Sequence, residues 1–429
     1  MSRRLPRLAD GVVLLRPWKI DDAPALMAGC REPDIARWFS LPSPYSFGHA
    51  ITWIGDAEAA WSDGHDAHLA VDEATTGRVV GAISLRGLVP AEAQGHVTYW
   101  VGGAHRRRGF ARHALALVAT WARDDLGLER LEAAAAVGNP GGRGVAEVAG
   151  FRPEAIYRSY RQVGAQRTDY ILYALPMPSW HVGPEWEDGV GQAQVEAQDE
   201  RPPTPKVVLP AEPPVLEGAG VRLRPYRADD LDVLVASIDE ETVRWLGHVP
   251  WPYDEAAGRG FLEFAAGSWL AHQAHFAVAD AASDVLLGGL NIDIDLPHAI
   301  GEVGYRVNPD ARGRGVATAA LGLAVAWAFE GLHLARLDLG ADTRNGASLR
   351  VAAKSGFRRE GTLHGLVRRA AKRSDDAVYS LLPTDLRGGQ NLASTQAPDP
   401  SVPRTPAPRS APPLPLAEPH PSSRKARPG

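Results

Sequence analysis

The chain has 429 residues, of which 45% are hydrophobic and 23% are charged, and its formal net charge is −5. This length leaves room for two or three domains of ordinary soluble composition, and the negative charge gives no reason to expect nucleic acid as the main partner. The single cysteine, Cys30, excludes an internal disulfide framework and a thiolate metal cluster, and it suits a reducing cytoplasm. The N-terminus leads into no signal peptide, and no stretch approaches the roughly 20 apolar residues of a membrane span. We therefore expect a soluble cytoplasmic protein without a membrane partner.

The same series of residues occurs twice along the chain, displaced by 206 positions. In each copy a tyrosine precedes an arginine- and glycine-rich loop, a Trp-Ala pair, an asparagine and a Gly-Phe pair. The series runs through Tyr99, residues 106–111, Trp121, Asn139 and Gly150, and again through Tyr305, residues 312–317, Trp327, Asn345 and Gly356. Repeat units of solenoid proteins span only about 20–50 residues, so a displacement of this length indicates a duplicated domain.

The composition between and after the two copies sets the expected domain boundaries. Residues 8–175 form the first domain and residues 218–386 the second. Residues 176–217 contain nine prolines and an acidic excess, which predicts a semi-extended linker. Residues 387–429 contain eleven prolines and too little apolar surface to order themselves, which predicts a disordered tail.

The second copy shows an α+β pattern in chain order. A strand is expected over 220–224, a helix over 228–238, and three strands over 275–279, 286–292 and 302–307. A strongly helical run follows over 318–329, then a strand over 337–341, a helix over 347–354 and a closing strand over 378–381.

The loop before the long helix carries the most specific chemical signal. Gly315 and Ala317 leave little side-chain bulk beside the backbone, and Arg312 and Arg314 add positive charge. Successive N–H groups that run into a helix N-terminus can hold a phosphate or pyrophosphate. The loop is not a Walker P-loop, because no Gly-Lys-Ser/Thr follows, and it lacks the spacing of a Rossmann fingerprint.

Several motifs in order then resemble the GNAT superfamily of acetyl-CoA-dependent N-acetyltransferases, and within it the subfamily that acetylates ribosomal-protein N-termini. The matching residues are 223–225 with 229–230, 301–305, 312–317, 345–348, 356–361 and 379–381. The resemblance implies two tandem folds, each with a mixed, mostly antiparallel central sheet flanked by helices. It also implies acetyl-CoA as co-substrate, no metal, and direct attack by an amine in a ternary complex.

The resemblance assigns roles to residues of the second copy. A bulge in the strand that ends near Val307 would open a slot for pantetheine, and Asn345 would bind that arm. Residues Gly313, Arg314, Gly315, Val316 and Ala317, beside Arg312, would hold the pyrophosphate. Glu302 matches the family's usual base, acting through water, although it also suits a surface ion pair. Ser348 could protonate the departing thiolate or cap the helix that begins there.

The first copy keeps the loop but changes two of these groups. Arg107, Arg108, Gly109, Phe110, Ala111 and Asn139 are the matching cofactor-binding candidates. His96 stands in place of Glu302, and Gly142 stands in place of Ser348 within a glycine-rich run that is a poor helix start. We expect a degenerate first domain, with His96 as an alternative base.

The acceptor and the assembly stay open at this stage. A protein N-terminal α-amine is the favoured acceptor, and a small molecule of antibiotic type is the alternative that Asp293 and Asp295 would suit. A non-catalytic acyl-CoA-binding sensor or scaffold is the alternative from a different class. The protein would be a monomer with an intramolecular pseudo-dimer, or a homodimer.

Overall fold

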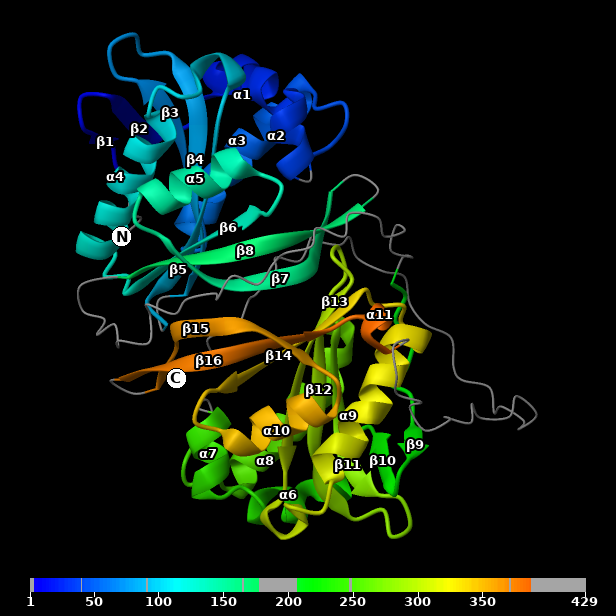
Figure 1. The fold of residues 1–429 in the computed structure, drawn as a ribbon. Helices are drawn as coiled ribbons and strands as arrows, with labels where there is room; N and C mark the ends of the chain where they lie inside the picture. The colour runs from blue at the N-terminus through cyan, green and yellow to red at the C-terminus, as the bar shows by residue number, and fades with distance from the viewer. Residues whose placement is uncertain are drawn as a thin grey trace, which may run out of the picture. The chain divides into compact units, whose positions relative to one another are not determined.

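The computed structural model describes residues 4–39, 41–89, 92–163, 166–176, 207–246, 249–369 and 372–386. Most of the expected linker and all of the expected tail lie outside these residues. The chain divides into two compact units (Figure 1). The first comprises residues 1–205 with 338–353 and 357–381, and the second comprises residues 206–337 with 354–356 and 382–429. No helix of the described ranges is long and apolar enough to cross a membrane.

The first unit contains the complete first repeat. Its strands are β1 (Leu8–Ala9), β2 (Val13–Pro17), β3 (Ala67–Glu73), β4 (Val79–Val89), β5 (Gln94–Val101), β6 (Arg130–Ala136), β7 (Arg152–Val163) and β8 (Gln166–Pro176). They lie in the order β1-β2-β3-β4-β5-β6-β8-β7, and only the pairing of β5 with β6 is parallel. The helices are α1 (Ala23–Cys30), α2 (Pro33–Trp38), α3 (Phe47–Ser62), α4 (Phe110–Asp124) and α5 (Pro140–Val148). The expected mixed, mostly antiparallel sheet is confirmed.

Both faces of this sheet are buried, because successive residues of a strand point to opposite sides. Leu69 and Val71 of β3 belong to the main core with Leu115 and Val118 of α4. Ala70, between them, belongs to a second cluster with residues of α1 and α3. Figure 1 shows α1, α2 and α3 gathered together and α4 and α5 in a separate group. The nearly continuous burial of β3 and β4 follows from this double covering.

The second unit holds most of the second repeat. Its strands β9 (Leu216–Gly218), β10 (Val221–Arg224), β11 (Gln273–Asp280), β12 (Leu286–Asp295) and β13 (Ile300–Val307) form an antiparallel sheet in the order β13-β12-β11-β10-β9. Its helices are α6 (Leu231–Ala236), α7 (Glu240–Leu246), α8 (Glu255–Ser268), α9 (Val316–Ala326) and α11 (Pro383–Leu386). The helix expected over 318–329 begins two residues earlier and ends in a π-helical turn, Trp327–Gly331.

The remaining elements of the second repeat are β14 (Arg336–Asp342), α10 (Gly346–Lys354), β15 (Arg358–Arg369) and β16 (Lys372–Leu381). Within the first unit β15 pairs antiparallel with β16, and it meets β7 at Gly361 and Ala155. A Cβ atom at Gly361 would lie 2.2 Å from the carbonyl oxygen of Glu154, so this contact requires glycine. The long strand β15 is not among the strands expected from the sequence.

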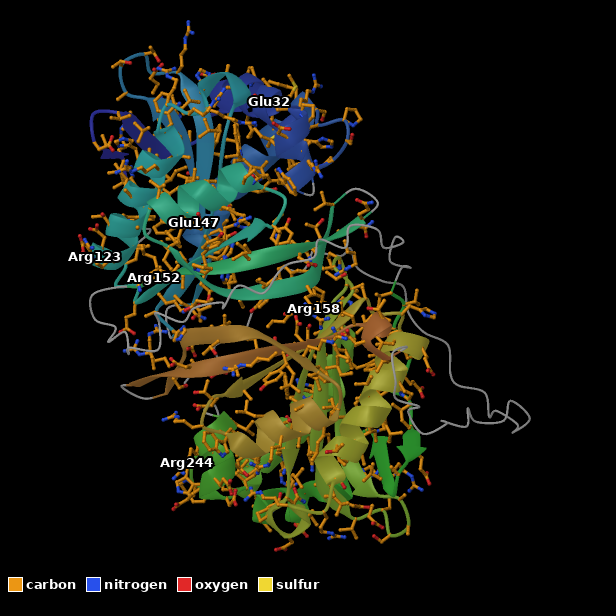
Figure 2. The ribbon with its side chains drawn as sticks, viewed as in Figure 1. Glu32, Arg123, Glu147, Arg152, Arg158 and Arg244 are labelled. Carbon is orange, nitrogen blue, oxygen red and sulfur yellow. The ribbon has the colours of Figure 1, made fainter. Side chains whose placement is uncertain are left out.

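Charged side chains are buried where β15 meets β7 in the first unit. The side chain of Arg130 is fully buried and its Nη1 lies 3.3 Å from Oε1 of Glu154, whose side chain is also fully buried. The same carboxylate accepts a hydrogen bond of 3.1 Å from the backbone N–H of His364. Arg158, marked in Figure 2, lies with its Nε 3.2 Å from Oε1 of Glu360. Buried charges of this kind need their partners, and we assign these residues a structural role.

The opening motif of each repeat also has a structural explanation. Nη1 and Nη2 of Arg16 donate to the carboxylate of Asp22 at 2.6 and 2.9 Å, and Nε donates to Asp72 at 2.6 Å. In the second repeat both terminal nitrogens of Arg224 donate to Asp230 at 2.8 Å. Each arginine therefore ties the strand that carries it to the helical segment that follows.

Candidate functional site

The loop before α9 has the backbone that an anion cradle needs. Gly313 and Gly315 have φ angles of 73° and 82°, in the left-handed region that favours glycine. Gly315 is the N-cap of α9, and no side chain caps this end of the helix. A Cβ atom at either glycine would meet nothing within 4 Å, so space beside the loop is open. The unpaired N–H groups of the first helical turn are thus available to a phosphate.

The loop of the first repeat follows the same path. Arg107 and Gly109 have φ angles of 62° and 84°, at the positions of Gly313 and Gly315. Gly109 is the N-cap of α4 and likewise has no side-chain cap. Arg107 is therefore held in a conformation that costs an L-residue about 1–2 kcal/mol, whereas Gly313 adopts it freely.

The arginines of the two loops have different surroundings. Arg312 donates to both carboxylate oxygens of Asp239 at 2.7 and 2.9 Å and to Glu241 at 2.8 Å, so it braces the loop against α7. Arg106 has the matching place in the first repeat and lies 2.6 Å from Asp34. A cation already engaged by carboxylates is a weaker phosphate ligand, and the cofactor role of Arg312 stays a prediction.

Arg314 and Arg108 lie at the open side of their loops. Arg314, Gly315 and Val316 line a small cavity of about 120 Å³, together with Asp280 of β11. Arg108 is paired with Glu73 and its guanidinium lies 4.7 Å from the centre of the Phe110 ring. In the second repeat, therefore, Arg314 and the first residues of α9 line the same hollow as the carboxylate of Asp280.

The strand before the loop carries Glu302 on its exposed side. Glu302 is exposed and lies directly opposite Asp293 in the ladder from β12 to β13. That ladder runs without a register shift as far as Gly288 and Val307. The pairing of β13 with β12 therefore has no bulge near Val307, and the bulge that the family resemblance implies toward the next strand stays a prediction. A Cβ atom at Gly288 would lie 2.3 Å from the carbonyl oxygen of Arg306, which explains the glycine.

The parallel pairing of β5 with β6 in the first repeat ends before β5 does. The pairing of β5 with β6 runs from Gln94 opposite Arg130 to Val97 opposite Ala133 and then ends. Strand β5 continues to Val101, so its last four residues separate from β6 and leave backbone groups without that partner. This geometry suits an extended thioester arm.

Two asparagines expected to contact the cofactor act as helix caps. Oδ1 of Asn345 accepts a hydrogen bond of 3.1 Å from the backbone N–H of Ser348, and Oδ1 of Asn139 accepts one of 3.0 Å from Gly142. Ser348 is the third residue of α10 and does not cap it. The glycine-rich run after Asn139, expected to start a helix poorly, forms α5, because Asn139 caps it and Pro140 occupies its first position.

The predicted residues divide between the two units. Glu302, Val307 and residues 312–317 belong to the second unit, whereas Asn345 and Ser348 are grouped with the first. The first-repeat candidates Arg107, Arg108, Gly109, Phe110, Ala111 and Asn139 all belong to the first unit. The structure thus brings Glu302 and the loop of the second repeat into one unit.

A shallow hollow next to the Arg312 brace was not predicted. It has a volume of about 640 Å³ and is lined by Asp239, Glu240, Glu241, Arg244, Ile238 and Trp251. Figure 2 marks Arg244 on α7, and Trp251 is 53% exposed. The sequence signal was weak, because three carboxylates and a tryptophan also occur together on ordinary surfaces.

The groups available for other chemistry are few. The described residues contain no cluster of three metal-ligating side chains. Burial raises the pKa of Cys30 to about 11, so this thiol is protonated at neutral pH. Burial, followed by the positive charges of Arg161 and Arg86, lowers the pKa of His96 to about 3. The neutral imidazole of His96 is then a weak proton acceptor.

Several known proteins are similar to this chain in sequence or in structure. A family model described as "Acetyltransferase (GNAT) domain" matches residues 13–152 and again residues 221–358. The Bacillus subtilis (strain 168) protein named "Uncharacterized N-acetyltransferase YoaA" is 23% identical over 40% of this chain and 98% of its own length. "Putative ribosomal N-acetyltransferase YdaF" of the same organism is 30% identical over 34% of this chain and 80% of its own length. A crystal structure of a GCN5-related N-acetyltransferase from Brucella melitensis matches with 30% identity and a TM-score of 0.38, over 43% of this chain and 84% of that one.

Proposed function

The chain belongs to the acetyltransferase (GNAT) domain family and contains two copies of that domain, and from this premise we propose that the second copy acetylates protein N-terminal α-amines. Acyl transfer from acetyl-CoA is the activity of an N-acetyltransferase. The choice of acceptor, the active copy and the roles of the residues below are our proposals. The observation that carries them is exposed Glu302 on β13, the strand that leads into the glycine loop, directly opposite half-buried Asp293 on β12.

The acidic pair suits an amine. An α-amine has a pKa near 8, so at neutral pH most of it arrives as an ammonium ion and must lose a proton before it attacks. Carboxylates at Glu302 and Asp293 attract that ion, and Glu302 accepts its proton, directly or through water. Peptide chains with a free N-terminus are acceptors of this kind.

The reaction then balances in one ternary complex. The amine nitrogen attacks the thioester carbonyl carbon, the C–N bond forms, and the C–S bond breaks. The proton from the amine goes to Glu302, and the CoA thiolate leaves with a proton from a donor. We retain Ser348 as the candidate donor, and Asn345 holds the helix that carries it. The loop at 313–317 binds the pyrophosphate through backbone N–H groups.

The test of this proposal uses the full chain, acetyl-CoA and a panel of amines. Peptides with different free N-termini, the same peptides blocked at the N-terminus, and an aminoglycoside are compared by release of free CoA thiol. We expect turnover with free N-termini, and we expect Glu302→Gln to abolish most of it while acetyl-CoA binding persists. Turnover confined to the aminoglycoside would favour the small-molecule alternative. Binding of acetyl-CoA without turnover on any amine would favour the sensor.

The first copy is proposed to bind CoA without turnover. Its loop keeps the geometry of the second, but Gly142 has no hydroxyl and His96 is a weak base. Calorimetric titration with acetyl-CoA tests this directly. A stoichiometry of two sites with a single Glu302-dependent activity is expected, whereas activity that survives Glu302→Gln would move the chemistry to the first copy.

A further inference from the structure

Each glycine loop has an arginine directly before its helix and a carboxylate at the end of a nearby strand. Arg108 and Arg314 precede the N-cap glycines of α4 and α9. Glu73 is the last residue of β3 and Asp280 the last residue of β11, and each pairs with the first residue of the strand before it, β2 or β10. The two carboxylates therefore occupy equivalent positions, but the side chain of Glu73 is longer by one methylene group.

In the first repeat this carboxylate holds the arginine. Nη2 of Arg108 donates to Oε1 of Glu73, and Oγ1 of Thr76 donates to Oε2 at 2.8 Å. The hydrogen bonds from Thr76 and Arg108 outweigh desolvation and lower the pKa of Glu73, so its carboxylate is ionised at neutral pH. The Arg108 guanidinium also lies 4.7 Å from the centre of the Phe110 ring. The positive charge beside the first loop is therefore already compensated.

In the second repeat the shorter carboxylate turns to its own hairpin. Oδ1 of Asp280 accepts hydrogen bonds from the backbone N–H groups of Ala282 at 3.2 Å and Ser283 at 2.9 Å, and from Oγ of Ser283 at 2.9 Å. Arg314 is exposed and lines the same cavity as Asp280, but within the described ranges it makes no hydrogen bond and no ion pair. Val316 begins α9 where the first repeat has a phenylalanine, so it offers the guanidinium no ring.

An anion that binds beside a loop must compete with any carboxylate that already holds the arginine. A guanidinium bonded to a carboxylate has to release it before it donates to a phosphate, and the released carboxylate repels the phosphate. We propose that Glu73 is an internal competitor for the anion site of the first repeat: the phosphate groups of CoA displace its carboxylate from Arg108, whereas Arg314 is free to receive them. This inference rests on the proposed function, because CoA is the anion, and it makes Glu73 the residue that sets the difference in affinity between the two loops.

The experiment measures the acetyl-CoA affinity of one loop at a time by calorimetric titration of the full chain. Gly315→Glu leaves the first loop to be measured, and Gly109→Glu leaves the second. In the Gly315→Glu background, Glu73→Gln keeps an acceptor for Thr76 and should tighten binding by about three- to tenfold, because an exposed ion pair and a repelling charge are both removed. In the Gly109→Glu background, Asp280→Glu introduces the longer carboxylate and should weaken binding by a similar factor.

A double variant and a matched control show whether the effect depends on Arg108. With Arg108→Gln already present, Glu73→Gln should change the affinity by less than about twofold, whereas a purely structural effect of Glu73→Gln would persist. Asp10 is the matched carboxylate, since its Oδ2 lies 2.7 Å from Nδ1 of His113 near the start of α4. Asp10→Asn removes one negative charge without touching Arg108 and should keep the affinity of the first loop within about twofold.

The outcomes separate this inference from the proposed function. If acetyl-CoA binds both loops but the affinity of the first is unmoved by Glu73→Gln, or moves equally in the Arg108→Gln background, the role of Glu73 is overturned and the cofactor role stands. An unchanged affinity of the second loop in Asp280→Glu would also overturn it. If acetyl-CoA binds neither loop, the cofactor role fails. The same variants are then titrated with inorganic pyrophosphate, and tighter binding in Glu73→Gln would uphold the competition whereas unchanged binding would overturn it.

Discussion

The two repeats share a backbone at the cofactor loop and differ in the charge of the neighbouring strand face. Residues 107 and 313 both adopt left-handed conformations, as do Gly109 and Gly315, so the backbone that we propose to bind pyrophosphate is retained twice. The face before the loop has changed from Asp293 and Glu302 to Arg86 and His96. Backbone N–H groups recognise phosphate whatever the side chains are, whereas proton transfer needs one side chain of suitable pKa. Cofactor binding can therefore outlast catalysis in a duplicated domain.

The largest expected effect separates the two cofactor loops. Gly315→Glu forces a side chain into a left-handed position and places a negative charge where the pyrophosphate binds. We expect acetyl-CoA binding at the second repeat to weaken by at least about 100-fold, because several charge-assisted hydrogen bonds are lost together. Calorimetric titration should report one site fewer per chain.

The matched control introduces the same side chain on the same helix. Gly322 of α9 has open space around it and no left-handed φ angle, so Gly322→Glu should leave both sites intact. Gly109→Glu should remove the other site. Unchanged stoichiometry in both Gly315→Glu and Gly109→Glu would mean that acetyl-CoA is not held at these loops.

The next largest effect is expected at Glu302, the proposed base, which His96 replaces in the first repeat. In a Glu302→Gln background we expect the rate to fall by about 10²–10⁴-fold, the usual contribution of a general base. Adding His96→Glu restores a carboxylate to the first repeat, but Gly142 still offers no hydroxyl to protonate the departing thiolate. Initial rates should therefore stay at the Glu302→Gln level. Recovery to within about tenfold of the native rate would show that one residue explains the difference between the repeats.

A smaller effect is expected at the ion pairs of Arg16 and Arg224, the arginines of the opening motif in each repeat. Asp72 is 3% exposed and bonded to Arg16 in the first repeat, whereas the Asp284 side chain beside Arg224 is 30% exposed. Asp72→Ala should lower the free energy of unfolding by about 3–5 kcal/mol, because it leaves a buried guanidinium short of a partner. Asp284→Ala should cost no more than about 1 kcal/mol. Urea unfolding of both variants measures the difference, and equal losses would contradict the assigned burial.

The ion pair of Arg16 with Asp22 predicts how the stability of the first repeat depends on pH. Burial of Asp22 acts to raise the pKa of its carboxyl, but the hydrogen bonds from Arg16 and from the backbone of Lys19 outweigh it and lower that pKa. A carboxyl whose folded pKa is depressed adds stability above its unfolded pKa of about 3.9 and loses it as the pH falls through the folded value. We expect Asp22→Asn to flatten the acid limb of the stability curve, which acid titration of unfolding would reveal.

The sequence predicted the duplication and most strands of the second repeat, because these depend on local pattern, and the cofactor role of the loops stays a prediction. It missed α8, whose three glycines, Gly258, Gly260 and Gly267, lower helix propensity, although Gly258 is buried against Leu231 and Val235. It missed β15 because charged residues interrupt the apolar alternation, and Glu360 is buried only because Arg158 and Ser380 bind it. Local propensity cannot report partners that lie more than 200 residues away.

The exchange of charge between the strand faces of the two repeats could not be predicted in full from the sequence. The pairing of His96 with Glu302 followed from the repeat alone, since both stand three residues before the strand tyrosine. The match of Arg86 with Asp293 needs the strand register, because the displacement there is 207 rather than 206. A one-residue difference in the connecting segments is enough to hide such a pair from a comparison by position.

The smallest expected effect tests the shared loop conformation itself. Arg107 has a φ angle of 62°, and Arg107→Gly removes strain of about 1–2 kcal/mol while adding some entropy to the unfolded chain. We expect a net gain of about 0.5–1 kcal/mol in the stability of the first repeat, measured by urea unfolding. Arg112, exposed near the start of α4, is the matched control, since Arg112→Gly should instead destabilise by about 1 kcal/mol. If the free energy of unfolding rises in Arg107→Gly and falls in Arg112→Gly, the first loop keeps the left-handed backbone despite its arginine. If it falls in both variants, Arg107 is unstrained.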